Sequence, residues 1–170
     1  MKLTIRETAI FSMLGTLMYC SKLIMEALPN IHLVGVLTIA YTVVYRRKAL
    51  YPIYIFVLLQ GIFGGFNLWW VPYLYMWTIL WGVTMLLPKK MPTKIAPIVY
   101  TVVCSLHGFL FGVLYAPAQA LFFGLDFKGM LAWIAAGAVF DTVHGVSNFL
   151  CSFLIVPIIT LLKRADKAAR

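Results

Sequence analysis

The sequence predicts an all-α integral membrane protein, one membrane domain over residues 1–170 that forms a bundle of six transmembrane helices. Of its 170 residues, 63% are hydrophobic and 11% are charged, whereas about 25% of the residues of a soluble domain are charged. Long stretches contain no Asp, Glu, Lys or Arg, and the basic residues gather in short clusters between them. That pattern is typical of membrane helices with flanking surface charges, and so small a soluble chain could not bury this much apolar surface.

Three uncharged stretches set the number of helices, and they cover 49–88, 95–125 and 142–162. One crossing needs about 20 apolar residues, so the first stretch is long enough for two helices. It is interrupted at 66–72, where Asn67 and Pro72 flank two tryptophans, as is typical of a turn at the membrane interface. The helices expected along the chain are 7–28, 31–45, 49–66, 71–87, 95–123 and 130–162.

Each expected helix has a recognisable limit in the sequence. The first ends at the Leu28-Pro29-Asn30 break, and the second is short and stops before the basic cluster at 46–48. The third and fourth share the first uncharged stretch, and the fifth follows the basic cluster at 89–94. The sixth is longer than a perpendicular crossing needs, so we expect it to be tilted or bent. No segment shows the alternation of about ten residues that a β-barrel strand requires.

The basic residues predict that both termini face the cytoplasm. With six spans, 12 of the 14 Lys and Arg residues fall on one side, and the exceptions are Lys22 and Lys128. The side richer in Lys and Arg is cytoplasmic by the positive-inside rule. Five spans would divide the clusters between the two faces. The twelve residues are Lys2, Arg6, Arg46, Arg47, Lys48, Lys89, Lys90, Lys94, Lys163, Arg164, Lys167 and Arg170.

Several functional classes lack their sequence motifs. There is no Gly-x-x-x-x-Gly-Lys-Ser/Thr phosphate loop, no His-Glu-x-x-His pair and no Gly-x-Ser-x-Gly elbow. The spacing of Cys20, Cys104 and Cys151 suggests neither a metal site nor a disulfide framework. The net charge of +9 is not spread along a polar face, so we expect no nucleic-acid partner. The sequence thus predicts a protein that is not an enzyme and has no cofactor or metal; a transporter of this kind would draw energy from an ion gradient or a partner.

Polar residues within the expected helices are costly in lipid and therefore informative. Asp141, His144 and Asn148 follow the i, i+3, i+7 spacing of one helix face, and Asp141 could hydrogen bond to His144. His107 in the fifth expected helix lies near the same depth. Two readings stay open: these groups either fasten the last two helices together or contact a ligand.

An aromatic face marks the fourth expected helix. Trp70, Tyr73, Trp77 and Trp81 recur at i, i+3, i+7 and i+11. An interfacial aromatic belt explains the outer members but not the deeper Trp77 and Trp81, and aromatic faces suit a flat ring. Polar residues also concentrate in the outer half of the expected bundle, which predicts a solute site open to the outside. They are Lys22, Glu26, His32 and Gln60.

Two stretches resemble a known family. One runs from Leu-Pro-Asn-Ile-His-Leu-Val at 28–34 to Arg-Arg-Lys-Ala-Leu-Tyr-Pro at 46–52. The other is Phe-Asp-Thr-Val-His-Gly-Val-Ser-Asn-Phe at 140–149, followed by Leu-Ile-Val-Pro at 154–157. Together with the size, the six spans and the missing ATPase motif, they resemble the substrate-binding S component of an energy-coupling factor (ECF) transporter for vitamins and other micronutrients.

The resemblance implies a function in the plasma membrane of a prokaryote. Such a component captures a micronutrient on its outer side and docks onto a membrane coupling subunit driven by two ABC-type ATPases. The substrate would be a flat heterocyclic vitamin or precursor. In this family a small-residue pair on the first helix meets the coupling subunit; here the pair is Ser12 and Thr16, not the usual two alanines. The ligand would lie beneath the outer loops, at Trp70, Tyr73, Trp77, Gln119, Asp141 and His144.

Other classes of function remain as alternatives. One is a stand-alone ion-coupled carrier, and another is a tryptophan-rich sensory protein, whose five spans would put the termini on opposite sides. A third is a structural or assembly subunit without a ligand, which would not need a deep aromatic face beside an Asp–His pair. The cobalt and nickel members of the S-component family use an amino-terminal histidine that this sequence lacks, so we do not expect those metals.

Overall fold

Every regular element of the described chain is helical, which confirms the all-α fold class. The computed structural model describes residues 3–28 and 30–168, so Lys2, Pro29 and Arg170 of the sequence arguments lie outside the described residues. Its α-helices are α1 Ile5–Ile24, α2 Val34–Tyr45, α3 Leu50–Gly64, α4 Tyr73–Leu86, α5 Ala96–Phe109, α6 Phe111–Phe123, α7 Phe127–Cys151 and α8 Ile155–Ala168. Short 3₁₀ segments are η1 Arg46–Ala49, η2 Leu68–Trp70 and η3 Ser152–Leu154.

The first helix begins where a capping box supplies partners for free backbone amides. The Thr4 hydroxyl accepts from the Glu7 amide at 3.1 Å, and the Glu7 carboxylate accepts from the Thr4 amide at 3.1 Å. The same carboxylate pairs with Lys48, which ties the start of α1 to η1. The helix therefore begins two residues before the expected position 7, and it ends at Ile24 rather than at 28.

The expected fifth helix, 95–123, is not continuous. It divides at Leu110, whose φ of −95° and ψ of 6° depart from helical values, into α5 and α6. A break leaves the first amides of the new helix without intrahelical partners. The Asp141 carboxylate of α7 accepts from one of them, the Gly112 amide, at 3.0 Å. A distant side chain thus stabilises a break that the local sequence does not announce.

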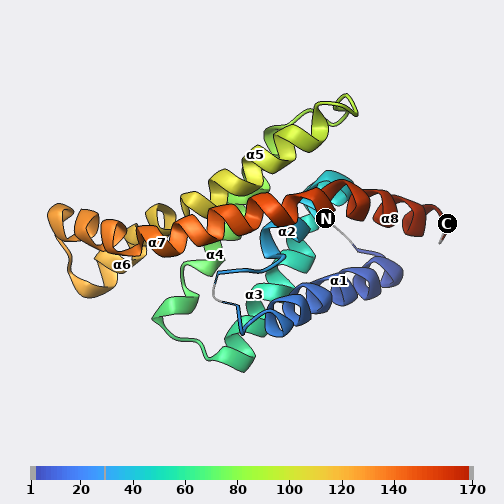
Figure 1. Ribbon diagram of the computed structural model, residues 1–170. Helices are drawn as coiled ribbons and strands as arrows, with labels where there is room; N and C mark the ends of the chain where they lie inside the picture. Colours follow the sequence, from blue (N-terminus) through green and yellow to red (C-terminus); the bar gives the residue numbers. More distant parts are fainter. Residues whose placement is uncertain (1–2, 29, 169–170) are drawn as a thin grey trace.

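The expected sixth helix begins earlier than predicted and bends. The Asp126 side chain accepts from the Gly129 amide at 2.7 Å, which caps α7 and moves its start from position 130 to Phe127. The bend falls at η3, just before Pro157. Because proline has no amide hydrogen and its ring crowds the preceding turn, the helix cannot continue undisturbed there. In Figure 1, α7 and α8 run along the length of the molecule as one bent rod.

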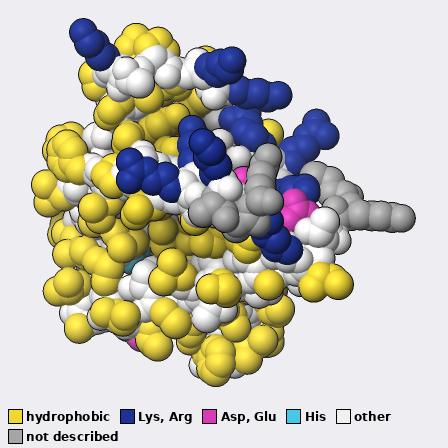
Figure 2. All heavy atoms as spheres, turned by 90° about the vertical axis from the view of Figure 1, so that its right-hand side faces the viewer, with side chains coloured by type: hydrophobic (Ala, Val, Ile, Leu, Met, Phe, Trp, Pro, Cys, Tyr) yellow, Lys and Arg dark blue, Asp and Glu magenta, His cyan; other side chains and the backbone are white. Residues whose placement is uncertain are grey.

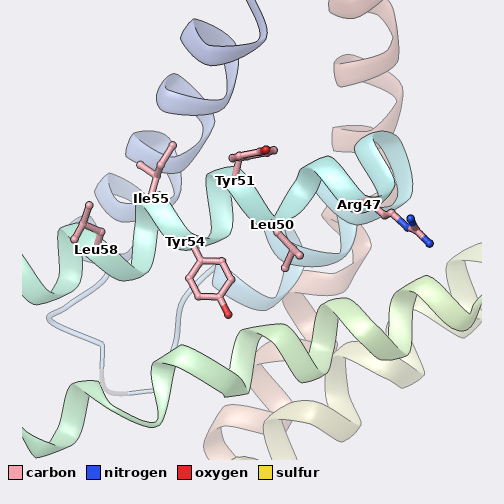
Figure 3. A pocket seen from close by; sticks show the side chains of 6 residues that line it. All are labelled: Arg47, Leu50, Tyr51, Tyr54, Ile55 and Leu58. Atoms are coloured by element: carbon pink, nitrogen blue, oxygen red, sulfur yellow. The ribbon is translucent and has the colours of Figure 1, made fainter. Parts of the chain in front are cut away.

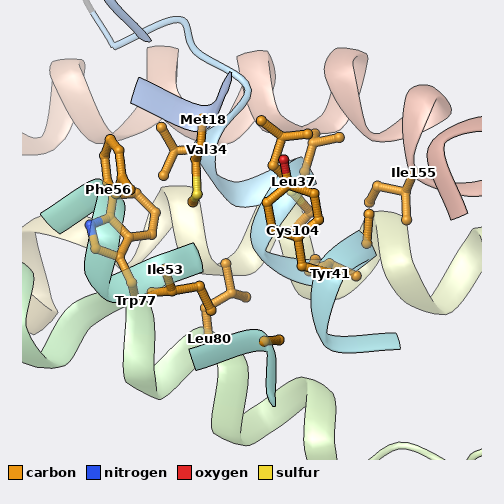
Figure 4. Close-up of a cluster of buried hydrophobic side chains, with 14 of the residues drawn as sticks. Met18, Val34, Leu37, Tyr41, Ile53, Phe56, Trp77, Leu80, Cys104 and Ile155 are labelled. Carbon is orange, nitrogen blue, oxygen red and sulfur yellow. The ribbon is translucent and has the colours of Figure 1, made fainter. Parts of the chain in front are cut away.

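Helix α2 forms the centre of the core. Its residues from Val34 to Thr42 are all buried, and it packs against α1, α4, α5, α7 and α8. Figure 4 shows its side chains between Met18 of α1, Trp77 of α4 and Ile155 of α8. A helix buried on every side needs mostly apolar residues all round, as the sequence of α2 has. The hydroxyl of its buried Thr42 donates to the Thr38 carbonyl.

The exterior is apolar except at one end. Large hydrophobic side chains are exposed on α1 and on α3 to α8, including Ile24, Leu86 and Leu121. Lys and Arg side chains gather at the end where both termini lie, here called the basic end (Figure 2). Two helical stretches, Ala96–Phe123 with 28 residues and Phe127–Lys167 with 41, are long and apolar enough to cross a membrane.

Candidate functional site

A small polar cavity lies under the connection between α1 and α2. This connection, residues 25–33, is found away from the basic end, at what we call the loop end (Figure 1). The cavity has a volume of about 160 Å³ and is bounded by four helices and this loop. Its lining residues are Lys22, Met25, Glu26, Leu28, Asn30, Ile31, His32, Tyr73, Phe111 and His144.

All three histidines of the chain meet at this place. The His32 ring from the loop lies 4.7 Å from the His144 ring of α7, edge to face. Trp77 of α4 contacts two of the histidines, with ring centroids 6.0 Å from His32 and 5.5 Å from His107 of α5. Phe111, at the start of α6, lies 4.7 Å from His144. Residues from five parts of the chain thus build one aromatic and imidazole cluster.

Several polar atoms of this cluster are buried without a hydrogen-bond partner among the described residues. Both ring nitrogens of His144 lack one, and this side chain is only 1% exposed. The indole nitrogen of Trp77, also 1% exposed, lacks one as well. His107 differs, because one of its ring nitrogens lies 3.2 Å from the Met76 carbonyl. An unmet buried polar group costs about 1–3 kcal/mol, so a solute that satisfied His144 would gain affinity.

Two charged residues, Lys22 and Glu26, belong to the lining of the cavity. Lys22 and Glu26 line this cavity and also a second one of about 140 Å³ that reaches Gln60 of α3. Among the described residues they form no ion pair with each other. Burial of its ring, and next the charge of Lys22, lower the pKa of His32 to about 4. His32 is therefore neutral near pH 7 and offers one donor and one acceptor nitrogen.

The aromatic residues predicted for the site have different places. Tyr73 lines the cavity, at the first residue of α4. Trp77 lies directly behind it and is covered by other rings, so no flat molecule can stack on it in this conformation. Trp70 is apart from the cavity, and its indole nitrogen donates to the Val57 carbonyl at 2.7 Å. Part of the predicted aromatic face of α4 thus serves packing and does not line the cavity.

The predicted polar residues also separate. His144 lines the cavity, whereas Gln119, near the end of α6, does not. Asp141 bonds to the Gly112 amide, and the direct Asp141–His144 hydrogen bond that the spacing allows does not form. Asn148 donates to the Cys104 carbonyl at 3.0 Å. Asp141 therefore fastens α7 to α6, and Asn148 fastens α7 to α5. The ring nitrogens of His144 remain available for other partners.

The predicted docking pair lies on the outside of α1. Ser12 and Thr16 are exposed, whereas Gly15 between them is buried. A β-carbon at Gly15 would come within 2.6 Å of Ile55 and 2.9 Å of the Pro52 carbonyl. Gly15 therefore brings α1 close to α3, whereas the hydroxyl residues Ser12 and Thr16 lie on the exposed side of α1.

His32 and Phe111 line the cavity but were not among the binding residues predicted from the sequence. The concentration of polar residues near the Leu28-Pro29-Asn30 break did point to His32. Phe111 carried no such indication, because its place depends on the break at Leu110. Glu26 and Asn30 line the cavity through the fold of the loop, which the sequence does not specify, and Lys22 lines it from the last turn of α1.

A larger groove of about 510 Å³ on α3 has a different character (Figure 3). Apart from Arg47 and two tyrosines it is lined by Leu50, Ile55 and Leu58. Tyr54 points to α4, where its hydroxyl donates to the Leu74 carbonyl at 2.9 Å. The groove lies on an apolar outer surface and lacks the unmet buried polar groups of the cavity at the loop end.

The described residues contain no group of three or more His, Cys, Asp and Glu side chains arranged to hold a metal ion. His32 and His144 contact each other edge to face, whereas the His107 ring packs on Trp77. The unpartnered ring nitrogens of His144 can form hydrogen bonds to a solute. No family model, no curated protein and no solved structure matches this chain.

Proposed function

We propose that the protein is a multi-pass membrane component that captures a small polar solute at its loop end. The observation that supports this most is His144, buried beside a polar cavity with both ring nitrogens unpartnered. The resemblance to an ECF S component fits such a design, with energy supplied by a coupling subunit and two ABC-type ATPases.

The membrane placement rests on the exposed apolar side chains and the single basic end. We propose six spans, formed by α1, α2, α3, α4, the α5–α6 stretch and the α7–α8 stretch, with both termini in the cytoplasm of a prokaryotic cell. Helices α2, α3 and α4 have 12, 15 and 14 residues, fewer than the roughly 20 of an unaided crossing. The bundle encloses α2, and irregular backbone next to a short helix is tolerated at membrane depth where protein encloses it.

Topology mapping tests this placement. Cysteines or reporters placed at either terminus and in the 89–94 loop should react from the cytoplasmic side, because these positions share the basic end. A cysteine at Gly124, between α6 and α7, should react from the outside. Detection of the carboxyl terminus outside would remove the six-span arrangement.

The size of the cavity limits the solute. A volume of about 160 Å³ is well below the roughly 300–1,000 Å³ of sites for drug-sized ligands. We propose a compact heterocyclic vitamin or precursor, whose ring nitrogens or hydroxyls meet His32 and His144. Its flat face would lie against Tyr73 and Phe111. These two rings would take the stacking role that the sequence assigned to Trp77.

A ligand screen tests the capture function. Purified protein should show a higher melting temperature with one compact heterocycle from a panel of vitamins, vitamin precursors and nucleobases, because a ligand that binds only the folded state stabilises it. The same compound should not stabilise a variant whose cavity is blocked, such as Ile31→Trp. Equal stabilisation of both proteins would place the solute elsewhere.

Docking to a coupling subunit is tested at the outer face of α1. The Ser12→Leu, Thr16→Leu double variant should bind solute normally, but uptake in cells that hold the partner subunits should fall about tenfold or more, because bulky side chains prevent close helix approach. The control is Thr142→Leu with Thr160→Leu, also exposed but on α7 and α8. Concentrative uptake by this chain alone under an ion gradient would favour the carrier alternative.

A further inference from the structure

The basic end contains another cavity, and its lining is rich in Lys and Arg side chains. It has a volume of about 570 Å³ and lies between α2, the α4–α5 connection, the start of α5 and α8. Within the described part of the chain no acidic residue lines it, and Asp166 of α8 is not among its lining residues. The cations around it are Lys89, Lys90, Lys163, Arg164 and Lys167.

The floor of this basic cavity is apolar. Val43 of α2, Tyr100 of α5 and Ile159 of α8 contribute to it. A soluble anion needs charges and hydrogen-bond donors but no apolar floor. A molecule that carries both an anionic group and a hydrocarbon part would match both halves of the lining.

An apolar groove adjoins the cavity. It has a volume of about 480 Å³, and Val156 lines both spaces. From there it follows α5 and the end of α7 away from the basic end, past Val102 and Phe149. Its remaining lining residues are Pro97, Ile98, Thr101, Ser152 and Phe153. The hydroxyls of Thr101 and Ser152 bond to each other at 2.7 Å, which leaves the groove surface largely apolar.

We infer that the cavity and groove together bind one anionic phospholipid, with its phosphate headgroup among the five cations and an acyl chain along α5 and α7. Clusters of Lys and Arg between helices at the cytoplasmic face attract anionic headgroups. The inference rests on the proposed membrane placement but not on the solute site, which lies at the opposite end.

Native mass spectrometry of the purified protein with added lipid tests the inference. Phosphatidylglycerol should stay bound to the intact protein under conditions that remove phosphatidylcholine. Lys163→Gln with Arg164→Gln should lower phosphatidylglycerol affinity roughly 30-fold, if each cation contributes about fivefold. Val156→Trp, which fills the junction and leaves all charges in place, should lower it as well.

A charge-matched control separates a site from general attraction. Arg6→Gln with Lys94→Gln removes two exposed cations of the basic end that do not line the cavity, and it should leave lipid retention unchanged. An equal loss in this control would overturn the inference in favour of surface electrostatics. If inorganic phosphate displaced the phosphatidylglycerol, the cavity would be a site for a soluble anion instead. If the cavity variants lost binding to a protein partner but kept their lipid affinity, the cavity would be a protein contact. Melting temperatures with the solute, measured on the same variants, report the loop-end site independently.

Discussion

His144→Phe should lower solute affinity about tenfold to a hundredfold without lowering the stability of the solute-free protein. Phenylalanine keeps a ring in contact with His32 and Phe111 but removes the two nitrogens that have no partner in the protein. A lost hydrogen bond costs about 0.5–1.5 kcal/mol, or about 1.5–3 kcal/mol with a charged group. Stability should be unchanged or higher, because an unmet buried polar group is removed. Calorimetry and thermal melts measure the two quantities separately.

His107→Phe is the matched control for this variant. The His107 ring belongs to the same cluster and packs on Trp77, with ring centroids 5.5 Å apart. It does not line the cavity, and one of its ring nitrogens lies 3.2 Å from the Met76 carbonyl. We expect lower stability and nearly unchanged solute affinity, which is the reverse of the His144→Phe result. If the His144→Phe protein instead melts well below the parent and binds the solute with normal affinity, His144 contributes to packing. The proposed position of the solute would then be wrong.

Gly108→Ala should destabilise the protein by about 1–3 kcal/mol, the usual cost of overpacking a tight contact. A β-carbon at this position would lie 2.8 Å from the Gly145 α-carbon, the His144 carbonyl and the Asn148 amide nitrogen. Two of these are backbone atoms and cannot move without separating α5 from α7. The hydrogen bond from Asn148 to the Cys104 carbonyl would be disturbed as well.

Gly82→Ala provides the comparison, because no atom lies within 4 Å of its added β-carbon. Alanine within a helix should leave stability unchanged or raise it by about 0.4–1 kcal/mol. Thermal melts in detergent, followed by circular dichroism, measure both variants. Similar melting temperatures for Gly108→Ala and Gly82→Ala would contradict the tight crossing of α5 and α7.

The sequence predicted the helices better than their interruptions. Uncharged stretches and basic clusters located every helical region, because apolar length is a property of neighbouring residues. The break at Leu110 was missed because its stabilising partner, Asp141, lies 31 residues away in the chain. The bend between α7 and α8 could be expected from the length of the sixth expected helix, and Pro157 accounts for the position of the bend.

The candidate site was predicted in part for the same reason. Helical spacing put His144 and Tyr73 on inward faces, and both line the cavity. Helical spacing could not predict that the Asp141 carboxylate would accept a hydrogen bond from a backbone amide of α6 and form none with His144. The fold of the 25–33 loop, which brings His32 over the cavity, depends on contacts with distant helices.

The burial of α2 has a consequence for the biogenesis of the protein. Ile155 and Ile159 of α8 belong to the same buried cluster as α2, yet Ile155 is synthesised 110 residues after Tyr45, where α2 ends. During synthesis α2 therefore lacks part of its enclosure until the ribosome has made α8. Such late, long-range contacts are slow to form, so a chain that stalled before Ile155 would expose the flank of its central helix to chaperones and proteases.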